Sequence, residues 1–370
     1  MTFPNLTIST SINSELLATS IKLGIAALLL TCLVSCKDNA KPSLSNANQN
    51  QQVQQQLLLN SKQAILDLDH TLLSSLMTKI DVNQPLPDGS SLLDWAVETQ
   101  SPKLVNLLLE NGATVDITNG NRFKPIIQAC RYGNSEIINA LLDKGANPKA
   151  TIEDGTSAFQ LCAGSATSID LARIANLGVD IDAQNAQGQT PIMWAANNGK
   201  VENLTYLVNQ GVNINHQTKL GYSPLFFAIK SQNLNTIQAA IKHGADLFAT
   251  AKDGTTAAQL AVYVANFEFL HWYISNLDSL MDQEQAQAVL SAFDRDGYQL
   301  LHAAVKANQP ELVTKLIALG ANPNTISEPS KLKWRYEANF KTESYIPPQL
   351  TPLEIAKQQK LVKIIEILEG

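Results

Sequence analysis

The sequence predicts an all-α solenoid, a stack of helix-turn-helix units whose connecting turns resemble β-hairpins. Three observations support this fold class. Opening positions recur every 33 residues from Gly89 to Gly254, a closing glycine follows 23 residues after most of them, and each interval holds two apolar stripes at helical spacing. A fixed period of this length is typical of units that bury their apolar faces only against their neighbours.

One unit, GQTPIMWAANNGKVENLTYLVNQGVNINHQ, shows how its elements arise. Thr190 supplies a capping hydroxyl and Pro191 a preset φ, so we expect a first helix from Pro191 to about Asn198. Gly199 interrupts that helix, and the apolar residues behind it recur at the spacing of a second helix. Gly211 is suited to close the second helix, because the residue after a helix often takes the left-handed conformation.

The turn sequences G-x-T-P at the opening and G-A-x-x-N at the close are similar to those of the ankyrin repeat family. GQTPIMWAANNG, GYSPLFFAIK and GYQLLHAAVKANQPELVTKLIALGANPN carry the resemblance most clearly, and it covers residues 57–370. It implies an ankyrin-repeat solenoid of about 8 to 9 repeats, counting degenerate caps at both ends. Because such repeats are scaffolds on which partners vary, the motifs indicate the fold far more than the function.

Two intervals between opening positions exceed the period. The spacing is 43 residues from Gly254 to Gly297 and 52 from Gly297 to Gln349. We therefore expect a helical insertion near residues 278–293 and a loop insertion near residues 325–347. Insertions at repeat junctions map to loops on one face, which is often the face that binds.

The N-terminal segment does not carry the repeat. An apolar run at residues 23–34 is too short for a comfortable membrane span and suits the core of a signal peptide. The run ends in Leu-Val-Ser-Cys, which resembles the bacterial lipobox, where the signal is cut before a cysteine that becomes lipidated. We expect a signal peptide at residues 1–35, lipidation of Cys36 and a flexible tether over residues 36–56. A transmembrane anchor that ends in cysteine is the alternative, and the translation start stays open.

Composition and charge restrict the setting of the domain. The chain is 45% hydrophobic and 16% charged, as expected for a cored domain, and its net charge of −6 argues against a broad nucleic-acid footprint. We expect a monomer in the bacterial envelope that faces the periplasm and is held to a membrane through Cys36. Lys37 rather than aspartate follows Cys36, and in lipoproteins this favours the outer over the inner membrane.

Catalytic and metal-binding patterns are missing from the sequence. The five histidines are scattered, and motifs such as HExxH, GxSxG and GxxxxGK[ST] do not occur. His302 falls at the histidine position of the family's TPLH turn, where the resemblance implies local hydrogen bonding. We therefore expect no enzymatic activity, no cofactor and no metal site. Cys130 and Cys162 are expected on first helices, either as small buried hydrophobes or as a disulfide in an oxidising compartment.

The resemblance implies that partners bind where the turns and the ends of the first helices meet in a groove. Carried over by position, and with two aromatics of the second insertion added, the candidate partner-binding residues are Phe123, Arg131, Tyr132, Leu220, Tyr222, Lys230, Tyr263, Arg295, Tyr298, Lys306, Trp334 and Tyr336. Aromatic residues and arginine are typical interface anchors. The copies that open at Gly155 and Gly188 present polar residues, and we assign Trp95, Trp194 and Phe227 mostly to packing. The aromatics of the insertion either bind a partner or fold back as a packed flap.

These expectations favour a membrane-tethered periplasmic module that captures or neutralises a partner protein, as immunity proteins or envelope scaffolds do. One alternative is an ankyrin effector delivered to a host cell, against which the lipobox speaks. Another is an enzyme that uses the C-terminal insertions, which is disfavoured because they hold no histidine or cysteine. The identity of the protein partner is not encoded in any of these patterns.

Overall fold

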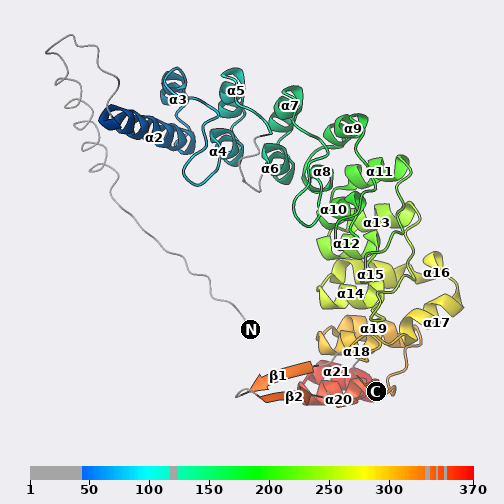
Figure 1. Cartoon of the computed structure of the whole chain (residues 1–370). Coiled ribbons are helices and arrows are strands. Elements are labelled where there is room, and N and C mark those ends of the chain that lie inside the picture. The colour runs from blue at the N-terminus through cyan, green and yellow to red at the C-terminus, as the bar shows by residue number, and fades with distance from the viewer. Residues whose placement is uncertain (1–43, 117–123, 330–333, 339–340, 346–347) are drawn as a thin grey trace, which may run out of the picture. The chain divides into compact units, whose positions relative to one another are not determined.

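The computed structural model describes residues 44–116, 124–329, 334–338, 341–345 and 348–370. The chain divides into two units between Val53 and Gln54, and the repeats belong to the second, Gln54–Gly370. Within the described residues, nine pairs of helices follow one another (Figure 1). The first helices of the pairs are α2 (Leu44–Leu66), α4 (Leu92–Glu98), α6 (Pro125–Tyr132), α8 (Ala158–Ser165), α10 (Pro191–Asn197), α12 (Pro224–Ser231), α14 (Ala257–Tyr263), α18 (Leu300–Lys306) and α20 (Pro352–Gln358). The second helices are α3 (His70–Met77), α5 (Pro102–Glu110), α7 (Ser135–Asp143), α9 (Ser168–Asn176), α11 (Val201–Asn209), α13 (Leu234–Lys242), α15 (Phe267–Ser275), α19 (Pro310–Ala318) and α21 (Val362–Glu369).

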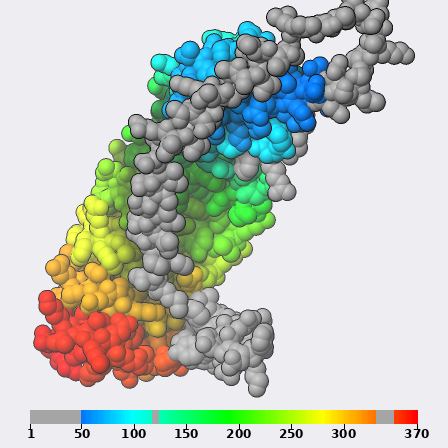
Figure 2. Space-filling view, turned by 90° about the vertical axis from the view of Figure 1, so that its left-hand side faces the viewer, coloured from blue at the N-terminus to red at the C-terminus, as the bar shows by residue number. Residues whose placement is uncertain are grey.

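The helices stack in two rows, one of first helices and one of second helices. From α4 onward, each first helix packs against the second helix of its own pair and against the first helix of the next pair, and the second helices pack along their row in the same way. Figure 2 shows the successive repeats adjoining one another in chain order. Their apolar faces merge into one core that extends from Leu58 to Ile364 and includes the fully buried Leu141 and Leu207. The predicted solenoid is therefore confirmed.

Local sequence signals set most helix ends. Helix α10 begins at Pro191 and ends at Asn197, one residue before the predicted end. Gly211, which follows α11, has a left-handed φ of 88°. One expected detail is wrong: Thr190 is the N-cap of α10 but makes no side-chain capping hydrogen bond, and its hydroxyl is buried without a partner among the described residues. Thr351 does make the full capping box at α20, because Glu354 is available three residues later.

The turn inside a pair places one residue in the left-handed region in eight of the nine described pairs. Two of these residues are glycines, and the others carry side chains: Leu68, Gln100, Gln232, Ala265, Asn308 and Lys360, with φ between 54° and 58°. Gly133 has a second constraint, since a Cβ there would lie 2.5 Å from the backbone carbonyl of Ser165. The end of α6 and the end of α8 therefore approach each other too closely for any side chain at residue 133.

Both insertions contain secondary structure. The first holds helices α16 (Leu277–Leu280) and α17 (Gln283–Ser291), and α17 packs against α18. The second holds strands β1 (Trp334–Ala338) and β2 (Lys341–Tyr345), which pair in antiparallel register with Trp334 opposite Tyr345 (Figure 1). The expectation of a loop is wrong for these strands, since aromatic residues and threonine favour extended pairing. In the described part of the chain, this hairpin and two isolated bridges are thus the only β structure, and the other regular elements are helices.

The region before the first recognisable repeat also differs from expectation. Helix α2 begins at Leu44, so residues 44–56, expected as flexible tether, are helical. No glycine or proline interrupts α2, and its glutamines and leucines are good helix formers. The predicted signal peptide, Cys36 and the rest of the tether lie outside the described residues. Among the helices that the structure describes, none combines the length and apolarity needed to cross a membrane.

Candidate partner-binding face

The candidate binding face consists of the turns that open the repeats together with the adjoining first helices. Backbone hydrogen bonds connect these turns from one repeat to the next. The amide of Ala186 donates to the carbonyl of Asp154 at 2.7 Å, and the amide of Lys252 donates to the carbonyl of Leu220 at 3.0 Å. Gly221 is required at this second contact, because a Cβ there would lie 2.8 Å from the amide nitrogen of Lys252. The turns therefore form a connected platform rather than independent loops.

A pocket of about 450 Å³ opens on this face beside Trp95. Its walls come from the turn and helix α4 of one repeat, with Asp88, Asp94 and Glu98, and from helix α6 of the next, with Gln128 and Arg131. The predicted site residue Arg131 thus lines a pocket. The neighbouring Tyr132 is 45% exposed, and its hydroxyl donates to Glu98 at 2.5 Å. That hydrogen bond to a carboxylate raises the pKa of the Tyr132 hydroxyl above its usual value.

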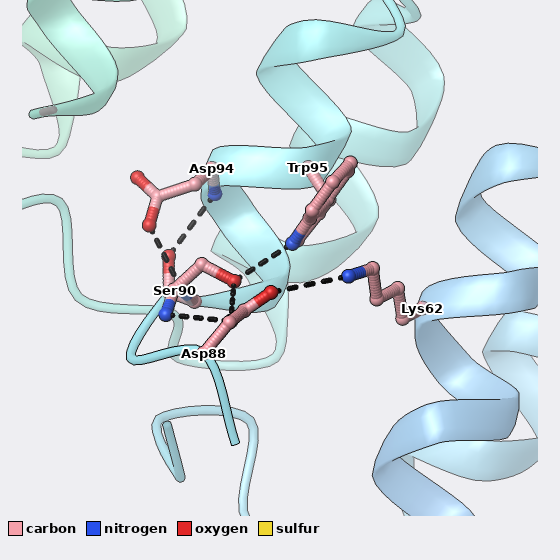
Figure 3. A network of polar contacts seen from close by, with 6 residues as sticks. Lys62, Asp88, Ser90, Asp94 and Trp95 are labelled. Carbon is pink, nitrogen blue, oxygen red and sulfur yellow. Dashed lines mark hydrogen bonds and ion pairs between the residues drawn. The ribbon is translucent and has the colours of Figure 1, made fainter. Parts of the chain in front are cut away.

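Trp95 is held by polar contacts on its edge and on one face (Figure 3). Its Nε1 donates to Ser90 Oγ at 2.7 Å, and the Lys62 Nζ of α2 lies 3.7 Å from the ring centroid. The same ammonium forms an ion pair with Asp88 at 3.2 Å, while Ser90 donates to Asp88 through its hydroxyl and its amide. The Ser90 hydrogen bonds hold the pKa of Asp88 below its ordinary value. The polar edge of Trp95 is therefore satisfied within the protein.

A second pocket, of about 220 Å³, lies three repeats further along beside Trp194. It is lined by Gln189, Met193, Trp194 and Asn197 of one repeat and by Phe227 and Lys230 of the next. Lys230 is another predicted site residue. Its Nζ lies 5.5 Å from the centroid of the Phe227 ring, and it forms no ion pair with the described residues. This pocket combines aromatic walls with one exposed cation.

Trp95 and Trp194 occupy the same position of their repeats, six residues after the opening glycine, but their indole nitrogens differ. The position next to the opening glycine is Ser90 in one repeat and Gln189 in the other. Gln189 Oε1 accepts from Asn185 at 2.9 Å instead of from the indole. As a result, Trp194 Nε1 is buried without a hydrogen-bond partner in the part of the chain that the structure describes. A buried donor without an acceptor costs free energy, on the order of 1 to 3 kcal/mol.

These pockets bear on two sequence interpretations. The copies that open at Gly155 and Gly188 were expected to be polar and without anchors, but the Trp194 pocket lies in this stretch. Trp95 and Trp194 were assigned mostly to packing. Both do pack against the core, as expected, and both also line pockets while half-buried; Phe227 lines the second pocket too, although it is buried.

Two other predicted site residues meet near the first insertion. The Tyr263 hydroxyl donates to Asp294, a buried carboxylate that also accepts from the backbone amides of Asp296 and Tyr298. The Arg295 guanidinium lies 5.7 Å from the centroid of the Tyr263 ring and 3.8 Å from an oxygen of Asp253. Burial raises the pKa of both Tyr263 and Asp294 above their ordinary values. The Tyr263 hydroxyl is therefore used inside the protein.

Tyr298 and Lys306 also come together, because Lys306 Nζ lies 4.7 Å from the centroid of the Tyr298 ring. The Tyr298 ring stacks on the buried His302 at 5.9 Å between centroids. His302 Nδ1 accepts from the amide of Gln299 at 3.3 Å, so its Nε2 donates to the carbonyl of Thr325 at 3.0 Å. The local hydrogen-bonding role expected for His302 is what the structure shows.

The remaining candidates differ in exposure and in whether they are described. Leu220 is 64% exposed at the tip of its turn, and Tyr222 is half-buried with its ring 5.6 Å from that of Phe226. Phe123 lies outside the described residues. Trp334 and Tyr336 lie on strand β1, but their side chains are outside the described part, so their role stays a prediction.

Cys130 and Cys162 form a disulfide between helices α6 and α8. Both side chains are fully buried. Of the two interpretations that the sequence leaves open, the structure has the disulfide. Among the described residues, no group of three or more histidine, cysteine, aspartate or glutamate side chains is arranged to hold a metal ion.

Comparison with known families agrees with this geometry. A family model described as "Ankyrin repeats (3 copies)" matches residues 62–152 and 159–251, and a second, "Ankyrin repeat", matches residues 296–328. Together these matches cover more than half of the 370 residues. The chain belongs to the ankyrin-repeat family. Ankyrin repeats are protein-interaction modules, so the face that carries the two pockets belongs to a protein-binding scaffold.

Three curated relatives of this ankyrin-repeat chain, all from eukaryotes, illustrate the similarity. It is 28% identical over 144 residues to "Palmitoyltransferase akr1" of Schizosaccharomyces pombe, a match that covers 39% of this chain and 22% of the relative. It is 28% identical to "Ankyrin repeat, SAM and basic leucine zipper domain-containing protein 1" of Atelerix albiventris, over 31% of this chain and 26% of the relative. It is 31% identical to "B-cell lymphoma 3 protein homolog" of Mus musculus, over 36% of this chain and 29% of the relative. The chain therefore spans less than a third of the length of each of these relatives.

Proposed function

We propose that this ankyrin-repeat chain is a protein-binding module of the bacterial envelope, anchored by a lipid on Cys36 and facing the periplasm. In this role it captures or neutralises one partner protein, as an immunity protein or an envelope scaffold does. The observation that carries the proposal is the buried disulfide between Cys130 and Cys162. Disulfides persist in oxidising compartments such as the periplasm and are rare in the cytosol, so the disulfide supports an exported protein.

The candidate binding face supports capture of a partner. The connected turns hold Leu220 exposed, and the two pockets place half-buried tryptophans beside Arg131 and Lys230. Aromatic and arginine side chains in pockets are the usual anchors of protein interfaces. We assign the chain no catalytic step, because the one hydroxyl beside a carboxylate in these pockets, Ser90 next to Asp88, also accepts from Trp95 and is engaged within the protein.

The position of the anchor follows from the residues around Cys36. The apolar run that ends at Cys36 and the following Lys37 support outer-membrane sorting of a lipoprotein. The disulfide speaks against the alternative of an effector that acts in the reducing cytosol of a host cell. The transferase named in one relative belongs to that protein, of which the matched region is about a fifth.

The test is membrane fractionation of the full chain expressed in a Gram-negative host. The Cys36→Ala variant should leave the membrane pellet and should lose the mass that the lipid adds to the mature N-terminus. A Cys130→Ala/Cys162→Ala variant is the matched control, because it removes the other two cysteines of the mature chain. It should stay in the pellet. Retention of Cys36→Ala in the pellet, or a mature wild-type chain without lipid, would contradict the anchor.

A further inference from the structure

The pocket beside Trp194 has an unmet hydrogen-bonding need. Trp194 Nε1 is buried without an acceptor among the described residues, although the equivalent Trp95 donates to Ser90. The difference follows from Gln189, which stands where Ser90 does and which hydrogen-bonds to Asn185 instead. The indole N–H therefore has no acceptor among the described residues of the free protein, and it lies on a residue that lines the pocket.

The same pocket also contains a positive charge, the ammonium of Lys230, which would attract a negatively charged acceptor. Lys230 is exposed at the end of α12, lies over the Phe227 ring, and has no carboxylate partner in the described part of the chain. By comparison, the cation beside Trp95 is Lys62, which is already paired with Asp88. In a chain of net charge −6, a pocket with one unpaired cation and one unsatisfied donor attracts an anion.

The size and the lining of the pocket indicate what kind of molecule carries the anionic group. A volume of about 220 Å³ falls below the roughly 300 to 1,000 Å³ of small-molecule sites, so the pocket suits a single side chain. The half-buried side chain of Trp194, together with the exposed edge of Phe227, offers apolar surface for an aliphatic stem. A glutamate side chain combines such a stem with a terminal carboxylate.

We infer that the Trp194 pocket binds an acidic side chain, glutamate above all, on a segment of the partner protein. The carboxylate accepts from Trp194 Nε1 and from Lys230 Nζ, and hydrogen bonds to an ionised acceptor are about twice as strong as neutral ones. The inference rests on the proposed function only in that the chain binds a protein. It names the chemistry by which the middle of the array recognises that partner.

The experiment follows the indole N–H signals of the ¹⁵N-labelled full chain in detergent by NMR. The chain has four tryptophans, and Trp194→Phe assigns the signal of interest. The probe is the peptide acetyl-Leu-Glu-Leu-amide. We expect a saturable shift of the Trp194 signal, with the Trp95 signal unmoved as an internal control. The same peptide with glutamine in place of glutamate should bind roughly tenfold more weakly, because it lacks the charge.

Variants of the pocket locate the effect. Lys230→Gln should weaken binding of the glutamate peptide by roughly tenfold, whereas Lys242→Gln, the same charge change on second helix α13, should leave it unchanged. Gln189→Ser restores the arrangement seen at Trp95. It should move the Trp194 signal without any peptide and should weaken the response to the glutamate peptide.

The inference would be overturned by any of these results: an unmoved Trp194 signal, equal responses to the glutamate and glutamine peptides, equal movement of the Trp95 signal, or a Gln189→Ser variant that behaves as wild type. A stronger response to acetyl-Leu-Gln-Leu with a free C-terminal carboxylate would assign the pocket to a chain terminus and also overturn it. The measurement needs neither the lipid nor the natural partner. Its failure is therefore distinguishable from failure of the Cys36 test.

Discussion

Cys130 and Cys162 join the first helices of two neighbouring repeats, with their Cα atoms 4.3 Å apart. The same junction brings Gly133 against the backbone of Ser165, and the Ser165 hydroxyl donates to the carbonyl of Cys130. Helices α6 and α8 are thus held by a covalent bond, a hydrogen bond and a close backbone approach at one place. This covalently constrained junction lies in the N-terminal half of the array.

Removal of the disulfide should lower stability measurably. The two cysteines are 32 residues apart, and closing a loop of that size stabilises a fold by about 3 to 4 kcal/mol in the chain-entropy model. The Cys130→Ala/Cys162→Ala variant should therefore unfold at lower denaturant than wild type. Added reductant should shift the wild-type transition and leave that of the variant unchanged. Alkylation of both Cys130 and Cys162 in the oxidised, denatured wild type, located by mass measurement of peptides, would contradict the bond.

Core leucines of the second helices should contribute far more to the free energy of unfolding than polar residues of the binding face do. Leu141 and Leu207 are fully buried on α7 and α11, so truncation of either to alanine should cost about 2 to 5 kcal/mol through lost burial and a residual cavity. Asn197→Ala is the control, since Asn197 is exposed at the end of α10. Equal unfolding midpoints for all three variants in urea would show that the buried stripe is misassigned.

His302 should make stability depend on pH. Burial lowers its pKa below the ordinary value of 6.5, so the folded chain keeps the imidazole neutral while the unfolded chain protonates it. Below about pH 6.5 the unfolded state then binds more protons, and the free energy of unfolding falls as pH decreases. His302→Gln can keep both hydrogen bonds and should remove this part of the slope. Denaturation between about pH 7 and 5 measures it, and parallel curves for the two proteins would refute the prediction.

Tyr263→Phe separates a structural role from a binding role. The substitution keeps the ring under Arg295 and removes only the hydroxyl that donates to the buried Asp294. We expect a loss of about 1 to 3 kcal/mol, because one hydrogen bond to a buried carboxylate disappears. Tyr222→Phe provides the control on the same face, since Tyr222 is half-buried and its ring contact with Phe226 is retained. An unchanged melting temperature for Tyr263→Phe would leave its hydroxyl available to a partner.

Residues whose conformation is decided locally were predictable from sequence. Pro191 can begin a helix but cannot continue one, and Gly211 tolerates the left-handed region. Both residues therefore mark helix ends independently of contacts with other repeats. His302 was predictable through the family resemblance, since its hydrogen bonds stay within its own turn and the next. These signals place nearly all the helix pairs.

The candidate site was less predictable, because its properties depend on contacts between repeats. Trp95 and Trp194 are equivalent by position, and only the neighbour at the opening turn, Ser90 or Gln189, separates a satisfied indole from an unsatisfied one. Comparison of that neighbour between copies could have found the difference. No such signal exists for Tyr263, whose acceptor Asp294 lies beyond the first insertion. The start of α2 was missed because a polar composition resembles a tether even when it contains no helix breaker.

The left-handed joint, present in eight of the nine described pairs, has an evolutionary consequence. The joint is left-handed at Gly199 (φ 68°) and also at Gln232 (φ 58°) and Ala265 (φ 56°), where a side chain makes that conformation less favourable. The packing of the two helices therefore imposes the bend, and the residue at the joint need not encode it. Duplication or deletion of a whole 33-residue segment leaves every remaining joint workable. The length of the array can thus change during evolution in complete units while the bends between helices are inherited unchanged.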